Sequence, residues 1–184
     1  AVARTGKYDV VIVEIGGTAG DIEGLPFLEA IRQFRGDVGP RNAVNIHVTL
    51  IPYIKSAGEI KTKPTQHSVK TLLEIGLQPD VLICRTEKPL NRELKDKIAL
   101  FCNVDTEAII EGRDVASIYE VPVVFEKERL ADTVLAKLNL KTGRPRLQQW
   151  MKFVAKVRKP RGKVRIVVCG KYTELKDAYK SISE

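Results

Sequence analysis

Residues 43–85, AVNIHVTLIPYIKSAGEIKTKPTQHSVKTLLEIGLQPDVLICR, decide the fold class of this 184-residue chain. The apolar runs at 43–51 and 80–85 are rich in β-branched residues, which predicts two strands of a mostly parallel sheet. Between them, apolar side chains recur at helical spacing over 65–76, which predicts a helix. A strand, a helix and a second strand in this order form the repeating unit of an α/β fold.

The same alternation continues on both sides of this stretch. A strand buried on both faces is predicted at 8–15, YDVVIVEI, and a weaker strand at 104–110. In a parallel sheet, ligands bind at the carboxyl ends of the strands, so candidate sites begin at Glu14, after Ile51 and at Arg85. Further helices are predicted at 25–36 with Pro26 in its first turn, 91–101, 115–119 with Asp114 as its cap, 127–138 and 147–157.

The end of the chain has a different composition. Seven basic residues and no acids lie between 152 and 165, and they carry nearly all of the net charge of +8. Because this run contains proline and glycine, it indicates a solvated linker. The pattern then restarts with a strand predicted at 163–170 and a helix at 173–183. One strand and one helix cannot bury a core, so this tail is either the start of a second domain or an edge addition to the first; the linker favours the former.

Composition excludes several classes of protein. A content of 43% hydrophobic and 29% charged residues is typical of a globular chain with one sizeable core. No apolar run is long enough to span a bilayer, so we expect no membrane association. The basic run lacks interleaved aromatic residues, so we expect no nucleic-acid partner. Cys84, Cys102 and Cys169 lack metal-ligand spacing and favour the reduced thiols of a cytoplasmic protein.

Glu14 ends an apolar run, where a carboxylate is costly unless it is paired or binds a cation. It is followed by GGTAGDIEG, whose glycines permit close approach of a ligand and whose acids are Asp21 and Glu23. Alternatively, Glu14 is an exposed strand end and Asp21 caps a turn in a tight connector. No GxxxxGK[ST] sequence occurs in the chain, so this loop is not a Walker A loop.

The stretch KTKPTQHS at 61–68 places many hydrogen-bond donors ahead of a helix. Thr65 is expected to cap that helix, whose first backbone N–H groups attract anions. Lys61 and Lys63 add point charges, while nearby hydroxyl and amide groups add donors. This combination fits a polyphosphate, and the alternative is a capped helix behind a solvated loop. A third group gives a weaker indication of a binding site, because residues of these types more often lie on the surface than bind a ligand. It comprises Arg85, Lys97 and Arg113–Tyr119.

Taken together and in this order, these features resemble the CTP synthase family. The likeness covers essentially the whole chain, and its motifs are long and specific. The matching strings are VEIGGTAGDIEGLPFLEAIRQ at 13–33, GEIKTKPTQHSVK at 58–70, the run from DVLICR to KIALFCNV at 80–104, GRDVASIY at 112–119 and GKYTELKDAYKS at 170–181.

The resemblance implies an activity and an architecture. In that family, ATP phosphorylates the uracil O4 of UTP, ammonia displaces the phosphate to give CTP, and a glutaminase domain releases the ammonia from glutamine. CTP inhibits by competing for the triphosphate position of UTP. The implied fold is a Rossmann-like, three-layer, mostly parallel sheet of a P-loop NTPase-like amidoligase domain at 1–145, then a linker at 146–162 and the start of a glutaminase domain at 163–184. The implied assembly is a cytoplasmic homotetramer with nucleotide sites at subunit contacts.

The resemblance also implies a role for each matching position. Glu14 would bind Mg²⁺ near the phosphates of ATP. The inhibitor CTP would contact Asp21, Ile22 and Glu23. The triphosphate of UTP or CTP would be cradled by Lys61, Thr62, Lys63, Pro64, Thr65 and Gln66, with Lys97 assisting. The adenine pocket of ATP would be lined by Arg113, Asp114 and Val115, together with Arg85.

Some parts of the family pattern have no match in this sequence. The P-loop, with its lysine and second Mg²⁺-binding aspartate, is missing, as are the glutaminase cysteine, histidine and glutamate. Cys169 ends a predicted strand and is not that cysteine. We therefore expect the chain to represent the middle of the enzyme and to be catalytically inactive alone. Two other hypotheses stay open: a non-catalytic module that binds nucleoside triphosphates, and a basic interaction protein.

Overall fold

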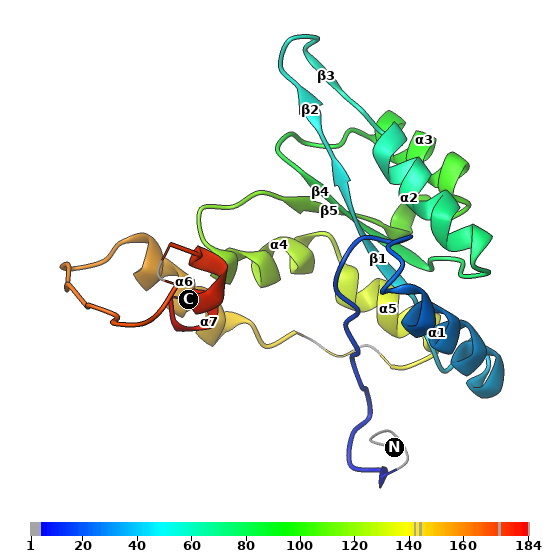
Figure 1. Cartoon of the computed structure of the whole chain (residues 1–184), viewed down its shortest axis with the longest axis horizontal. Helices are drawn as coiled ribbons and strands as arrows, with labels where there is room; N and C mark the ends of the chain where they lie inside the picture. The colour runs from blue at the N-terminus through cyan, green and yellow to red at the C-terminus, as the bar shows by residue number, and fades with distance from the viewer. Residues whose placement is uncertain (1–4, 142, 144, 173, 184) are drawn as a thin grey trace. The chain divides into compact units, whose positions relative to one another are not determined.

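The computed structural model describes residues 5–183 apart from 142, 144 and 173. The chain divides into two units, Ala1–Leu147 and Gln148–Glu184, which are described separately. The first unit contains a parallel sheet in the order β1–β4–β5 and an antiparallel hairpin, β2–β3 (Figure 1). The strands are β1 (Ile46–Ile51), β2 (Tyr53–Ile54), β3 (Glu59–Ile60), β4 (Val81–Thr86) and β5 (Ile109–Arg113).

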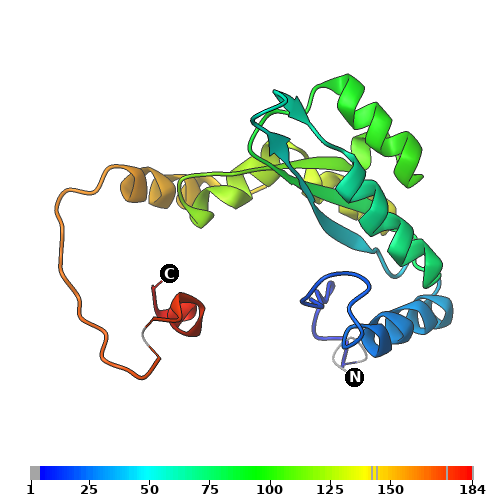
Figure 2. The same cartoon turned by 45° about the horizontal axis from the view of Figure 1, so that its top comes forward.

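Helices cover both faces of the parallel sheet, so the first unit has three layers (Figure 2). Helix α2 connects β1 to β4, and α3 connects β4 to β5; both pack on one face. Helices α4 and α5 follow β5 and pack on the other face. This arrangement confirms the predicted Rossmann-like α/β class. The helices of this unit are α1 (Leu25–Val38), α2 (Lys63–Glu74), α3 (Arg92–Cys102), α4 (Val121–Lys127) and α5 (Leu130–Lys137).

The hydrophobic core lies on both sides of β4, the central strand. On one face, Leu82 and Cys84 pack with residues of α2 and α3, such as Val69 and Ile98. On the other face, Val81, Ile83 and Ile110 pack against apolar residues of α4 and α5. Because a strand with helices on both faces must be apolar throughout, β4 reads as a continuous apolar run, as its sequence predicted.

Two helix boundaries follow from local chemistry. Asn91 caps α3, since its side chain accepts a hydrogen bond from Leu94 N at 2.9 Å. The helix predicted at 127–138 begins only at Leu130, as α5, and the helix α4 before it was not predicted. Arg129 separates them with a left-handed backbone at φ = 59°. A right-handed helix cannot continue through that conformation.

Two predicted strands are absent from the structure. Residues 8–15 are irregular, and Ile12 is 90% exposed. Residues 163–170 are irregular as well, and Val164 is 89% exposed. Both segments have strand-forming composition, but among the described residues neither lies beside a neighbouring strand. A strand without a partner leaves its backbone groups to water, so composition alone does not make it form.

Other predicted boundaries shift by a few residues. The weaker strand predicted at 104–110 begins only at Ile109, after a 3-10 turn at Thr106–Ala108. The short helix predicted after Asp114 is a 3-10 turn at Ile118–Glu120. Its cap is Ser117 and not Asp114, because the Ser117 side chain accepts a hydrogen bond from Tyr119 N.

The second unit consists of two helices with little other regular structure. Helix α6 (Gln148–Arg158) confirms the predicted helix at 147–157, and α7 (Lys180–Ser183) follows a 3-10 turn at Lys176–Tyr179. Among the residues whose placement is described, no helix combines the length and apolar character needed to cross a bilayer.

Candidate functional site

The carboxyl ends of the three parallel strands meet at one edge of the sheet. In the pairing register, Thr86 lies opposite both Ile51 and Arg113, which are the last residues of β1 and β5. The loop after β1 and Arg85 therefore lie here, as the sequence predicted, and the segment after β5 lies here too. We call this region the carboxyl edge.

Helix α2 begins at the carboxyl edge with a first turn that no side chain caps. Thr62 is the N-cap residue, but its hydroxyl accepts a hydrogen bond from Gln66 Nε2 at 3.1 Å and makes no capping bond. Pro64 lies in the first turn, where a missing N–H costs little. The first backbone N–H groups of a helix have no acceptor within it, and with the helix dipole they attract an anion.

Two lysines lie on either side of this helix start. Lys61 and Lys63 are exposed, whereas Thr62 between them is buried. Lys61 Nζ lies 2.5 Å from Glu59 Oε1, and both side chains are about half exposed, so water screens this pair. Within the described residues, the Lys63 side chain makes no hydrogen bond or ion pair. The helix start and the two ammonium groups together make this region a candidate site for an anion with several phosphate oxygens.

Thr65 does not cap α2, contrary to the prediction. It lies inside the first turn and is fully buried. Its hydroxyl is hydrogen-bonded to Thr49 Oγ1 at 3.0 Å and lies 3.2 Å from the carbonyl oxygen of Leu50. The Thr65 side chain thus anchors the start of α2 to β1 and does not face a ligand at this edge.

A second contact of the same kind joins α2 to β1 further along. Ser68 Oγ lies 2.8 Å from His47 Nε2, so this hydroxyl also faces the sheet and not the carboxyl edge. Burial lowers the pKa of His47. His67, the other histidine of the chain, is exposed. Of the polar side chains in KTKPTQHS, the lysines therefore face outward while the hydroxyls hold the helix in place.

Sequence reasoning missed Lys88, which also lies near the carboxyl edge. Its Nζ lies 5.2 Å from the centre of the Tyr53 ring, in a cation–π contact with the β2–β3 hairpin. Lys88 follows β4 by two residues, so its place after a predicted strand was a signal that could have identified it.

The predicted adenine-pocket residues lie at the carboxyl ends of β4 and β5 and just after β5, and the two arginines pair with different carboxylates. Arg85 Nη2 is 3.4 Å from Asp114 Oδ1, which joins the ends of β4 and β5. Arg113 donates from Nε and Nη2 to Glu111 Oε1 at 2.8 and 2.5 Å. Val115 is partly buried. Sequence reasoning also missed Glu111, a carboxylate in the apolar strand β5 that is only 7% exposed.

The predicted contacts of the inhibitor CTP are not at the start of α2. Asp21 Oδ2 accepts a hydrogen bond from Thr18 N at 3.0 Å, so this carboxylate stabilises its own turn. A Cβ at Gly20 would lie 2.9 Å from Cγ2 of Thr71, which places this loop against α2. Thr71 lies about 12 Å along the helix from Lys63, given 1.5 Å per residue. Ile22 is 82% exposed, and Glu23 is exposed too.

Glu14 lies in the irregular segment before this loop and is exposed. Over the part of the chain that the structure describes, no three His, Cys, Asp or Glu side chains gather closely enough to hold a metal ion. Proteins commonly bind Mg²⁺ through one or two carboxylates plus substrate phosphates. The donor chemistry of Glu14 therefore fits a shared Mg²⁺ site but does not make a complete one.

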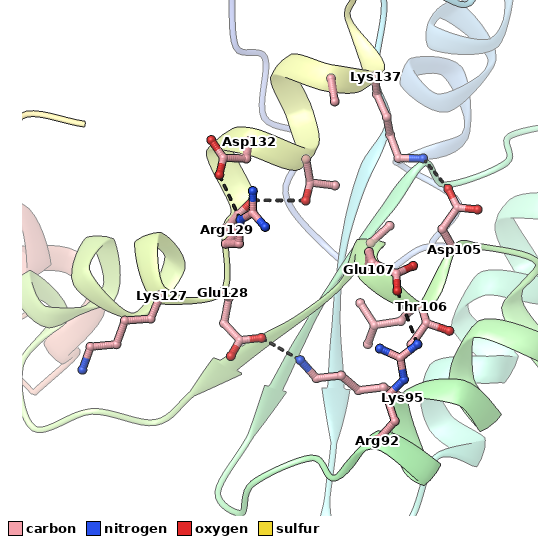
Figure 3. A pocket seen from close by; sticks show the side chains of 14 residues that line it. Arg92, Lys95, Asp105, Thr106, Glu107, Lys127, Glu128, Arg129, Asp132 and Lys137 are labelled. Carbon is pink, nitrogen blue, oxygen red and sulfur yellow. Dashed lines mark hydrogen bonds and ion pairs between the residues drawn. The ribbon is translucent and has the colours of Figure 1, made fainter. Parts of the chain in front are cut away.

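A cavity of about 660 Å³ lies between α3, α5 and the start of β5 (Figure 3). None of the predicted site residues lines it; Lys97 of α3 is exposed but is not among the lining residues. Its charged side chains are mostly paired with one another, as in the contact of Lys95 Nζ with Glu128 Oε2 at 2.7 Å and of Lys137 Nζ with Asp105 Oδ2 at 3.0 Å. Paired charges offer little attraction for a charged ligand, so the carboxyl edge is the better candidate.

A three-layer parallel sheet with a basic helix start at its carboxyl edge defines a Rossmann-like α/β protein with a candidate anion site. The family model described as CTP synthase N-terminus matches residues 1–140. The chain belongs to the CTP synthase family.

Similar proteins agree with this assignment. A CTP synthase of Methanocaldococcus jannaschii is 62% identical over 177 residues, which cover 96% of this chain and 33% of that protein. A CTP synthase of Cytophaga hutchinsonii is 56% identical over 182 residues, covering 98% of this chain and 34% of that protein. The chain therefore spans about a third of the length of these relatives, and the resemblance found in the sequence is confirmed.

Proposed function

We propose that the chain is part of a CTP synthase, a ligase of pyrimidine nucleotide biosynthesis that aminates UTP to CTP with ATP and with ammonia from glutamine. The observation that carries this proposal is the start of α2. Its unsatisfied N–H groups lie beside the exposed ammonium groups of Lys61 and Lys63. A triphosphate offers several oxygens with negative charge, which such a site would bind by charge-assisted hydrogen bonds.

The roles within this site follow from the direction of each side chain. Lys61 and Lys63 contact the triphosphate of UTP, or of CTP as inhibitor, together with backbone N–H groups of the 61–66 stretch. Thr62 and Thr65 are buried and hold that backbone in place. Lys97, exposed on α3, is proposed to assist from the neighbouring helix.

We assign ATP to the other part of the carboxyl edge. Arg113, Asp114 and Val115 are proposed to line the adenine pocket, with Arg85 beside them through its contact with Asp114. When bound, Mg²⁺ neutralises charge on the phosphates, and Glu14 would supply one carboxylate ligand.

The inhibitor CTP is proposed to contact Asp21, Ile22 and Glu23. Because this loop packs against α2 about 12 Å from Lys63 along the helix, these contacts are proposed to come from a neighbouring subunit of a homotetramer. We place the enzyme in the cytoplasm and propose no nucleic-acid or membrane partner. The 184-residue chain alone is proposed to be inactive, and detecting UTP- and ATP-dependent CTP formation by it would contradict this.

The test of the triphosphate site is UTP binding by the purified chain, measured by calorimetry. Lys61→Ala and Lys63→Ala should each weaken UTP binding by about tenfold, since each removes a charge-assisted contact worth about 1.4 kcal/mol. Lys70→Ala is the matched control, because Lys70 is a 75% exposed lysine on the same helix. Equal affinities for all four proteins, or no UTP binding at all, would refute the proposed site.

A further inference from the structure

Glu111 is a buried carboxylate whose two oxygens are both used as acceptors. Oε1 accepts from Arg113 Nε at 2.8 Å and from Nη2 at 2.5 Å. Oε2 accepts from the backbone N of Leu90 at 2.8 Å. The Glu111 side chain is only 9% exposed, whereas that of Arg113 is 47% exposed. One buried group thus holds an arginine at the end of β5 and the loop that follows β4.

The backbone of Glu111 is held from its other side. Its N–H donates to Glu128 Oε2 at 3.0 Å, and the same oxygen accepts from Lys95 Nζ at 2.7 Å. Figure 3 shows Lys95 and Glu128 reaching toward each other across the end of the cavity. The backbone of Glu111 is therefore held by Glu128, the residue after α4, while its carboxylate is held by Arg113 of its own strand and by the backbone of Leu90.

These contacts determine how Arg113 is presented. A guanidinium has five N–H donors in a rigid plane, and Glu111 engages Nε and Nη2. Among the described residues, the remaining donors of this 47% exposed side chain make no hydrogen bond. The contact with Leu90 N also fixes the end of the loop that carries Lys88 against Tyr53. A buried carboxylate costs free energy unless its hydrogen bonds are made, and here both oxygens make them.

We propose that Glu111 is a positioning residue of the nucleotide site: it orients the Arg113 guanidinium and the 87–90 loop for contact with ATP. This inference rests on the proposed function, in which Arg113 lines the ATP pocket. Glu111 does not contact the nucleotide. It acts by presenting Arg113 in one orientation, so that binding does not have to order that side chain.

The decisive variant is Glu111→Gln in the complete 184-residue chain. An amide has one acceptor oxygen, so glutamine cannot accept from both Arg113 and Leu90, and its NH₂ group must face one of these donors. ATP affinity should fall about tenfold, as expected for loss of one charge-assisted contact, while UTP affinity should stay within about twofold. Glu107→Gln is the matched control, because Glu107 is an exposed carboxylate that pairs with Arg92 and has no described contact at the carboxyl edge.

A second readout does not depend on nucleotide binding. Proton NMR of the Arg113 Nε–H group and hydrogen exchange of the Leu90 amide report the two contacts directly, with Arg113→Lys used to assign the arginine signal. In the wild-type chain both should be protected from exchange, and Glu111→Gln should remove the protection of at least one.

The outcomes separate the inference from the proposed function. An equal loss of ATP and UTP affinity, or unchanged protection in Glu111→Gln, would overturn the positioning role. Binding of UTP without ATP by the wild-type chain would overturn it as well, because Arg113 would then contact no nucleotide. Binding of neither nucleotide would refute the proposed function, and the protection measurement would still decide whether Glu111 orients Arg113 and the loop.

Discussion

The hydroxyl of Thr65 offers a sharp test of how α2 is anchored. Thr65 is fully buried, and its hydroxyl reaches Thr49 Oγ1 at 3.0 Å and the Leu50 carbonyl oxygen at 3.2 Å. Thr65→Val replaces only this hydroxyl with a methyl group of similar size. Because valine and threonine are both β-branched, the change alters helix propensity little.

The expected loss of stability follows from the hydrogen bonds that the substitution removes. One hydroxyl carries one proton, so the two contacts count as about one net hydrogen bond, worth about 1 kcal/mol. Removing it also leaves a buried acceptor of β1 without its donor, which costs roughly 1 kcal/mol more. We expect the free energy of unfolding to fall by about 2 kcal/mol, which shifts the urea midpoint by about 1 M at a slope near 2 kcal/mol/M.

Urea denaturation followed by circular dichroism measures this loss. Thr71→Val is the matched control on the same helix, because the Thr71 hydroxyl bonds only to the carbonyl oxygen of His67 one turn earlier, at 3.1 Å. That variant should lose less than about 0.5 kcal/mol, since most surface substitutions stay within this range. If Thr65→Val lost no more than Thr71→Val, the proposed anchoring of α2 to β1 would be wrong.

Two further predictions concern titratable groups. Burial lowers the pKa of His47, so below the ordinary histidine pKa of about 6.5 the unfolded state binds more protons, and the free energy of unfolding falls as the pH falls. His47→Gln should flatten this dependence between pH 7 and 5, and His67→Gln, which replaces the exposed histidine, is the matched control. Equal curves for both variants would contradict the assignment. Burial also raises the pKa of Cys84 to about 12 and that of Cys102 to about 11, so at pH 8 only the exposed Cys169 should react quickly with a thiol reagent. Cys169→Ser should abolish the fast phase in the native chain, and a fast phase that persists would show that a buried thiol is accessible.

The sequence predicted the elements whose partners are close in the chain. β1, α2 and β4 follow one another within residues 43–86, so each helix or strand packs against its sequence neighbour. Apolar periodicity was enough to identify these elements, and capping by Asn91 fits the predicted start of α3 within one residue. The strands predicted at 8–15 and 163–170 failed because a strand needs a hydrogen-bonding partner, which its own composition cannot supply.

The candidate site, like the fold, could be predicted from the sequence only in part. The rule that ligands bind at the carboxyl ends of parallel strands directed attention to Arg85 and to the loop after β1, which do lie at one edge. It also directed attention to Glu14, which follows no strand in the described part of the chain. It did not distinguish Lys63, which is exposed, from Thr65, which is buried under the same helix turn. Side-chain direction depends on how the helix rotates about its axis when it packs on the sheet, and the motif does not state that rotation.

By itself, the sequence determined the α/β class and the family and directed attention to the edge where we propose the anion site, because alternating apolar periods and long motifs are local properties of the chain. Only the tertiary structure decided which polar groups of that edge face outward and which hold the site in place. Glu111 shows the reason: a carboxylate in a strand is recognised as a positioning group only when the donors that surround it, from Arg113 and Leu90, are seen in space. Hydrogen-bond partners distant in sequence are set by packing.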